Sequence, residues 1–237
     1  MRSKGKLYLI PNILAPNTAE MVIAPQVKEI IKNTHYYLAE NIRTARRYIS
    51  SLNLEINIST LHFEVLDKRT QEKEMAALAA PLLSGHDLGI VSEAGCPGIA
   101  DPGALAVSYA HKKSIQVVPI SGPSSLFLAL MASGFSGQKF TFHGYLPIDR
   151  KERINAFKQL ESQAKKDGST QLFMETPFRN QKLLEDLLAH LLPDTPLCIA
   201  KNLTGADEMV RTLTVAEWKK SMPDLHKVPT VFLLGRN

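Results

Sequence analysis

Short apolar runs alternate with longer amphipathic stretches along most of the chain. Runs such as Leu7–Ile10 and Leu88–Val91 are typical of buried strands, and the stretches between them carry apolar residues at helical spacing. We predict strands at 7–10, 36–39, 88–91, 115–118, 171–174, 197–200 and 231–234. Helices are predicted up to residue 31 and at 43–52, 72–83, 104–111, 124–132, 151–166 and 180–192. This alternation predicts α/β layers with mixed, mainly parallel sheets.

The pattern breaks near Pro119 and restarts after Gly122. At 237 residues the chain is long enough for two small domains, and we place them at 1–118 and 119–237. In open α/β sheets, ligands bind at the carboxyl ends of strands. That rule selects the loops that follow Ile10, Val91, Pro119, Met174 and Ala200.

Composition excludes several other classes of protein. With 44% hydrophobic and 22% charged residues, the chain is an ordinary globular sequence rather than a fibrous or disordered one. No apolar run approaches the ~18 residues of a membrane helix, and the basic N-terminus lacks a secretory cleavage site. The 2 cysteines give neither a disulfide framework nor a zinc site, and no metal-ligand spacing stands out. We therefore expect a soluble cytoplasmic protein without a metal.

The segment between Val91 and Gly103 is the strongest candidate for a ligand loop. Three glycines and two prolines, in Ser-Glu-Ala-Gly-Cys-Pro-Gly-Ile-Ala-Asp-Pro-Gly, follow a buried strand and precede a helix. Glycines let a ligand approach the backbone, and the next helix offers its N-terminal amides. The loop is neither a dinucleotide fingerprint nor a P-loop. A tight structural turn is the alternative.

A second candidate loop runs from Val117 to Ser125, with the sequence Val-Val-Pro-Ile-Ser-Gly-Pro-Ser-Ser. It ends a strand, crosses the predicted domain boundary and starts a helix with hydroxyl side chains. A linker followed by a capped helix would have the same pattern. A ligand held between two domains would contact both loops.

Together with three other segments, these loops resemble the tetrapyrrole methylase superfamily, the class III S-adenosylmethionine (SAM)-dependent methyltransferases. The matching segments are 39–43 (Ala-Glu-Asn-Ile-Arg), 92–97, 100–103, 119–124, 142–147 (Phe-His-Gly-Tyr-Leu-Pro) and 173–179 (Phe-Met-Glu-Thr-Pro-Phe-Arg). They are most similar to the bacterial small-subunit rRNA cytidine ribose 2′-O-methyltransferases. The resemblance runs from Leu7 to Gly235.

The resemblance implies two α/β domains with SAM in the cleft between them, in a homodimer. By position, the cofactor-binding residues would be Pro11, Ser92, Glu93, Ala94, Gly95, Ile99, Ala100, Ser121, Gly122, Ser124, Ser125, Met174, Ala200, Asn202, Pro229 and Thr230. Apolar residues near loops, such as Phe135 and Phe178, are candidates for the dimer interface.

Several substrate-side motifs depart from the family pattern. Where the family has Asp-Thr, this chain has Asn41-Ile42, and a glutamate of the family is His143 here. The first loop, 11–16, lacks the usual glycine, and Glu93 replaces an aspartate. Cofactor-side motifs match better, so the resemblance supports methyl transfer more firmly than it supports ribosomal RNA as the acceptor.

A base that accepts a hydroxyl proton would assist methyl transfer to a ribose. Glu40 and Arg43, in the family-like segment 39–43, are the predicted catalytic residues. Other groups at loop positions that could serve as base or charge stabiliser are Glu93, Asp101, His143, Glu175 and Lys201. No role is assigned to His62 or His111.

A formal charge of +5 is compatible with a polyanionic partner. The cluster Arg150, Lys151 and Arg153 lies where the rRNA branch has a basic stretch, so we expect it to contact the phosphate backbone of rRNA or of the small ribosomal subunit. A solvated helix face is the alternative. Two other functions remain open: a methyltransferase acting on a tetrapyrrole or another small molecule, and a SAM-binding homologue without catalysis.

Overall fold

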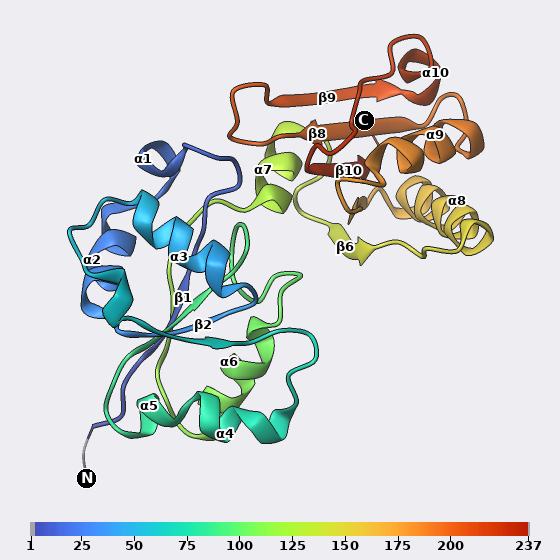
Figure 1. Cartoon of the computed structure of the whole chain (residues 1–237). Coiled ribbons are helices and arrows are strands. Elements are labelled where there is room, and N and C mark those ends of the chain that lie inside the picture. Colours follow the sequence, from blue (N-terminus) through green and yellow to red (C-terminus); the bar gives the residue numbers. More distant parts are fainter. Residues whose placement is uncertain (1–2, 237) are drawn as a thin grey trace. The chain divides into compact units, whose positions relative to one another are not determined.

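The computed structural model describes residues 3–236, which divide after Ser124 into two compact units (Figure 1). The predicted boundary after Val118 lies a short distance before this point. Residues 119–124 stay with the first unit, because Ile120 is buried in its core and Gly122 packs on Pro11.

The first unit contains a five-stranded parallel sheet with the order β3-β2-β4-β1-β5. Its strands are β1 (Leu7–Ile10), β2 (Tyr36–Ala39), β3 (His62–Val65), β4 (Leu88–Val91) and β5 (Val117–Pro119). Strand β3 was missed by the sequence patterns, since it lies at the sheet edge and its residues are mostly exposed. Because all the strands run the same way, their carboxyl ends share one edge of the sheet.

Two apolar clusters cover the two faces of this sheet, as the alternation along β1 shows. Ile10 packs with helices α1 (Ala19–Val22), α2 (Pro25–Asn33) and α3 (Ile42–Ser51), and with the 3-10 helix η1 (Ile58–Thr60). Leu7 packs with α4 (Met75–Leu78), α5 (Ala80–Leu83) and α6 (Gly103–Lys112) (Figure 1). Successive side chains of a strand point to opposite faces, so the sheet is the middle layer of three.

The single helix predicted over 72–83 is wrong. The structure has a 3-10 turn η2 (Glu72–Glu74), then α4 and α5, with the break at Ala79. Pro81 lies in the first turn of α5, where its missing N–H costs nothing. In the middle of a continuous helix the same proline would have removed a hydrogen bond.

The second unit has a mixed sheet with the order β6-β7-β10-β8-β9. Its strands are β6 (Phe140–Tyr145), β7 (Thr170–Met174), β8 (Pro196–Lys201), β9 (Met209–Thr214) and β10 (Thr230–Leu234). Only β6 and β7 pair in parallel, while β10 is antiparallel to both β7 and β8. Strands β7 and β8 therefore end at the edge where β10 begins. Strands β6 and β9 were not predicted, and both lie at the outer edges of the sheet.

Four helices complete the second unit: α7 (Ser125–Ala132), α8 (Arg150–Asp167), α9 (Asn180–His190) and α10 (Val215–Trp218). Its core joins α8, α9 and α10 to the sheet through buried side chains such as Phe157, Leu187 and Trp218. The indole Nε1 of Trp218 donates to the carbonyl of Leu197 at 2.8 Å, which satisfies its polar group inside this core. Across residues 3–236, no helix is long and apolar enough to cross a membrane.

Candidate functional site

The loops after β1 and β4 are joined at the carboxyl edge of the first sheet. Asn12 and Gly95 form a two-residue antiparallel bridge, with backbone N···O distances of 2.9 and 3.2 Å. The buried Asn12 side chain also donates from Nδ2 to the carbonyls of Ser92 (2.9 Å) and Glu93 (3.0 Å). Asn12 was not singled out from the sequence, although a polar residue just after a buried strand and a proline is a usable signal.

Hydrogen bonds inside the glycine-rich loop hold its shape. The Ser92 hydroxyl donates to the carbonyls of Ala94 (3.2 Å) and Gly95 (3.0 Å). Both Gly95, with φ +70°, and Ala100, with φ +57°, adopt left-handed backbone conformations. A left-handed alanine is strained, and such strain is common at ligand-binding loops.

Asp101 also stabilises the glycine-rich loop through hydrogen bonds to its backbone. Its Oδ1 accepts from the backbone N–H of Gly98 (3.3 Å) and of Gly103 (3.0 Å), where α6 begins. The carboxylate therefore ties the loop to the start of the helix, and it has a structural task that does not require a substrate.

The loop after β5 is packed directly against the loop after β1. A Cβ added to Gly122 would lie 2.1 Å from Cβ of Pro11, so only glycine allows this approach. The thiol of Cys96 lies 3.5 Å from the carbonyl of Pro123. Three loops that are far apart in sequence thus contact one another at this edge and form one rim.

A group of carboxylates lies along the same edge. The pKa of Glu40, which follows β2, is raised above its ordinary value, first by desolvation and then by the charges of Glu93, Asp101 and Asp67; Lys68 partly offsets this. Asp67 and Lys68 follow β3 and were missed because that strand was missed. This environment makes Glu40 a better proton acceptor than an ordinary glutamate.

The residues Asn41-Ile42, which differ from the Asp-Thr of the family pattern, still allow a capped start of helix α3. Asn41 is the N-cap, and its Oδ1 accepts from the backbone N–H of Arg43 (3.0 Å) and of Thr44 (3.2 Å). Aspartate and asparagine cap helices about equally well. Arg43 is exposed on the first turn of the helix.

In the second unit, the candidate residues lie at the edge of the sheet where β7 and β8 end. Met174 pairs with Val231, which pairs on its other side with Ala200. The backbone N–H of Asn202 donates to the carbonyl of Pro229 at 2.9 Å. Thr230 opens β10 beside them, so five of the predicted residues lie side by side, and Ser125 begins α7 of the same unit.

The turn after β8 is held in an unusual backbone conformation. Asn202 and Thr204 have φ of +47° and +67°, and the Asn202 side-chain amide donates to Asp207. The Thr204 hydroxyl is buried, with no hydrogen-bond partner among the described residues. Positive φ angles and an unsatisfied polar atom therefore occur together in this turn.

Two other predicted candidates have structural partners. His143 Nε2 lies 2.7 Å from Oε1 of Gln171. Glu175, whose side chain is only 3% exposed, accepts from the Arg179 guanidinium at 2.6 Å. Lys201, the last residue of β8, lies at the edge just described.

The basic cluster at the start of α8 divides into inward and outward groups. Arg153 turns inward, with its NH2 group 2.7 Å from the buried Asp186, and its side chain is 11% exposed. Burial alone would raise the pKa of Asp186, but hydrogen bonds from Arg153 and Arg150 and the charge of Lys182 hold it below its ordinary value. Lys151 is exposed and available to a polyanion, and Arg150 is 62% exposed although its Nε lies 3.3 Å from Asp186 Oδ1.

Comparison with known proteins places the chain in a family. The family model "Tetrapyrrole (Corrin/Porphyrin) Methylases" matches residues 17–219, across both units. The chain belongs to the tetrapyrrole methylase family. It is a SAM-dependent methyltransferase.

Relatives cover both units. The chain is 29% identical to "Ribosomal RNA small subunit methyltransferase I" of Escherichia coli O157:H7, over 98% of this chain and 78% of that protein. It is 33% identical to the protein of the same name from Vibrio cholerae serotype O1, over 89% and 69%. The solved structure of the methyltransferase CobJ has the same fold, with a TM-score of 0.61, 17% identity and coverage of 98% of this chain and 94% of that one.

The residues at these edges suit SAM in their chemistry. At the rim of unit 1, the backbone N–H groups of Glu93, Ala94 and Ala100 have no protein partner among residues 3–236, although the loop itself is fixed. Beside them Ile99 exposes 51% of an apolar side chain. SAM consists of an adenosine, a cationic sulfonium and an amino acid. Free backbone amides can donate to its polar groups, the apolar surface suits the adenine ring, and the carboxylate suits the positive charge.

Proposed function

We propose that this protein methylates a ribose 2′-hydroxyl of ribosomal RNA, with SAM as the methyl donor. The observation that carries the proposal is the 29–33% identity, across both units, to relatives named for methylation of small-subunit ribosomal RNA. The match includes the motif segments that the fold brings to the carboxyl edge of the first sheet.

We propose that SAM is bound by the residues at the two strand edges. In unit 1 these are Pro11, Ser92, Glu93, Ala94, Gly95, Ile99, Ala100, Ser121, Gly122 and Ser124; in unit 2 they are Ser125, Met174, Ala200, Asn202, Pro229 and Thr230. Glu93 and its neighbouring carboxylates favour a ligand that carries a positive charge. When bound, SAM supplies an electrophilic methyl group.

Glu40 is the proposed base. A ribose hydroxyl is a weak nucleophile, and a carboxylate that accepts its proton speeds transfer by ~10²–10⁴-fold. The raised pKa of Glu40 suits this task and predicts that the acidic limb of the rate profile lies above the range of an ordinary glutamate. Arg43, one helical turn away, is proposed to hold a phosphate next to the reacting ribose.

The decisive experiment measures transfer of a radiolabelled methyl group from SAM to three acceptors: small ribosomal subunits, naked rRNA and a corrin or porphyrin. Label in RNA, mapped to one nucleotide and resistant to base hydrolysis at its 3′ phosphodiester, would support the proposal. Label only in the macrocycle, or in no acceptor although SAM binds, would contradict it. Glu40→Gln should bind SAM and lose most of the rate.

RNA contact by α8 is tested by the salt dependence of binding. In a plot of the logarithm of the binding constant against the logarithm of the salt concentration, each phosphate contact contributes about −0.9 to the slope for a duplex and about −0.7 for a single strand. Lys151→Gln should lower the slope by about one contact, whereas Arg150 and Arg153 both pair with the buried Asp186, which excludes these two residues from a clean test. Lys166→Gln, at the far end of the same helix, is the matched control. An unchanged slope would refute the contact.

We further propose that the protein acts in the cytoplasm as a homodimer. Phe127 and Met131 on α7 are 56% and 79% exposed, and the Phe127 ring meets Phe140 of the edge strand β6. Edge strands with apolar side chains favour association. Phe135 is 8% exposed and packs on Gly235, so it does not serve as the interface expected from sequence. Phe127→Glu should shift the sedimentation mass to that of a monomer if this surface is the interface.

A further inference from the structure

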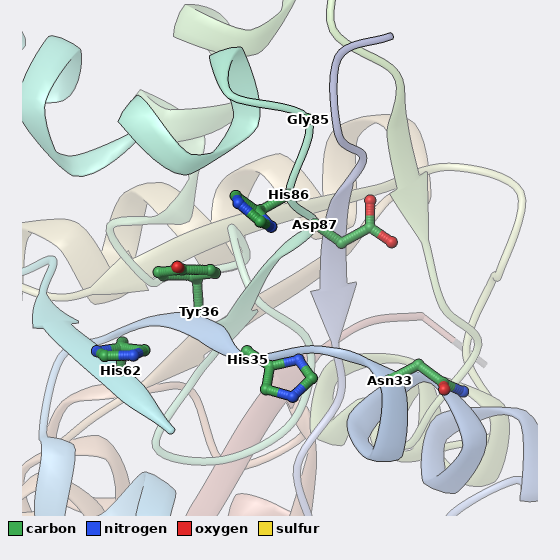
Figure 2. Close-up of a pocket in the computed structure, with 7 residues that line it drawn as sticks. All are labelled: Asn33, His35, Tyr36, His62, Gly85, His86 and Asp87. Carbon is green, nitrogen blue, oxygen red and sulfur yellow. The ribbon is translucent and has the colours of Figure 1, made fainter. Parts of the chain in front are cut away.

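A pocket lies at the amino edge of the first sheet, opposite the rim that carries the family motifs. It has a volume of about 520 Å³. Its lining comes from the ends of three neighbouring strands and their preceding turns, as Figure 2 shows: Asn33, His35, Tyr36, His62, Gly85, His86 and Asp87. Neither the family motifs nor the proposed methyl transfer uses any of these residues.

Three rings in this pocket form a column. The Tyr36 ring stacks on His62 with centroids 5.1 Å apart and an angle of 17° between planes, and it meets His86 at 5.3 Å and 43° (Figure 2). Backbone pairing produces this arrangement, because Tyr36 and His62 are register partners in adjacent strands, and such strands lie ~4.8 Å apart. Both histidines are exposed, so the column is accessible from solvent.

The polar groups beside the column are suited to the edge of a flat ring. Figure 2 shows the side chains of His35, Asn33 and Asp87 around the cavity next to the stacked rings. Asn33 Nδ2 already donates to the Glu29 carbonyl (2.8 Å), and Asp87 Oδ1 already accepts from the Lys6 N–H (2.7 Å). The His35 imidazole and the second oxygen of Asp87 can still form hydrogen bonds with a ligand. Stacked rings with polar groups beside them suit a planar ligand that carries hydrogen-bonding atoms at its edge.

We propose that this pocket binds an unpaired base of the RNA substrate by stacking. The inference rests on the proposed function, and it adds a second contact to the RNA. Strand β2 crosses the sheet from Tyr36 to Ala39 and reaches Glu40 at the other edge. Four residues span ~13 Å, so the base in the pocket belongs to a different nucleotide from the one that is methylated. Stacking on tyrosine and histidine is a common way to hold single-stranded RNA.

The test compares binding of a mixed-sequence single-stranded RNA oligonucleotide with binding of an oligonucleotide of equal length and charge that has abasic sites. Replacing both rings, His62→Ala with His86→Ala, should weaken binding of the first about 5- to 100-fold and leave the second unchanged. The slope against salt should stay the same, because no phosphate contact is lost. His111→Ala, an exposed histidine on α6, is the control.

Variants that keep an aromatic ring at both positions show whether a loss of binding comes from the missing rings or from a disturbed structure. His62→Phe with His86→Phe should bind the oligonucleotide as the unaltered protein does. Equal affinities of the alanine double variant and the His111→Ala control, or an equal loss for both oligonucleotides, would overturn the inference. Methyl transfer to ribosomal subunits is measured separately: if the unaltered protein methylates RNA and the pocket variants change nothing, the pocket assignment alone fails. If it methylates no RNA, the proposed function fails.

Discussion

Asn12 is the residue whose replacement should do most damage to the proposed cofactor rim. Its side chain is buried, and it connects the loop after β1 to the glycine-rich loop after β4. Truncation in Asn12→Ala removes Nδ2, which donates to the carbonyls of Ser92 and Glu93, and Oδ1, which accepts from the Ile13 N–H at 2.8 Å. No other side chain among the described residues donates to those two carbonyls.

The cost follows from which groups are left without a partner. Ser92 is 3% exposed, so water cannot replace the lost donor at its carbonyl, and an unsatisfied buried acceptor costs ~1–3 kcal/mol. Glu93 is exposed, so water can reach its carbonyl and the loss there is a net hydrogen bond of ~1 kcal/mol. Together these give about 2–4 kcal/mol of lost stability. Asn12→Asp should be at least as harmful, because it points a carboxylate oxygen at two carbonyl oxygens.

Two measurements check this reasoning. Urea unfolding gives the loss of stability, and calorimetric titration with SAM gives the affinity, which should fall about tenfold if one loop residue must be ordered on binding at ~1–2 kcal/mol. Asn155→Ala, an exposed asparagine in α8, should change neither quantity. The explanation fails if Asn12→Ala unfolds at the same urea concentration as the unaltered protein, or if it is destabilised but binds SAM equally well.

Three further substitutions test other parts of the structure. Gly122→Ala should displace the loop after β5, since its Cβ would lie 2.1 Å from Cβ of Pro11, and SAM titration should show weaker binding; Gly137→Ala, with open space around its Cβ, should not change it. Asp186→Asn should cost about 3 kcal/mol at pH 7 in urea unfolding. Because the folded-state pKa of Asp186 is lowered, its stabilisation is present above the unfolded value near ~3.9 and is lost as pH falls through the folded value, so the variant should lose part of the acid dependence. Asn41→Ala should cost ~1 kcal/mol through the lost cap of α3, and Asn41→Asp should restore it.

Hydrophobic periodicity was sufficient for the buried strands and for the edge strand β5, but it failed at the other three edge strands. Central strands such as β4 are buried on both faces, so their apolar runs are unambiguous. Edge strands β3, β6 and β9 carry mostly exposed or half-exposed residues, and their pairing is decided by neighbours that are distant in sequence. Local patterns cannot supply that information. The antiparallel pairing of β10 was not predictable for the same reason. Strand β10 lies between β7 and β8, and the periodicity of its own residues does not indicate which strands it pairs with or in which direction.

The rule that ligands bind at carboxyl ends of strands selected loops that the fold brings together, but it could not predict the contacts between those loops. Glycine at 122 and proline at 11 are each common loop residues, and only the fold shows that one is required by the other. The inward turn of Arg153 likewise depends on Asp186, 33 positions away. A basic residue in a sequence has no visible partner until the helices α8 and α9 are packed together.

The two edges of the first sheet differ in charge, and this difference suits them to different proposed tasks. The carboxylates that raise the pKa of Glu40 make the rim with the family motifs negative, which favours the cationic SAM and disfavours RNA phosphates. A ribose hydroxyl is neutral and can approach such a rim, whereas the backbone on either side of it needs other contacts. Exposed cations such as Lys151 supply charge, and the column of rings at the amino edge supplies stacking without charge. Apart from the one phosphate assigned to Arg43, an acidic methyl-transfer edge therefore leaves the other RNA contacts of the proposed reaction to groups away from that edge.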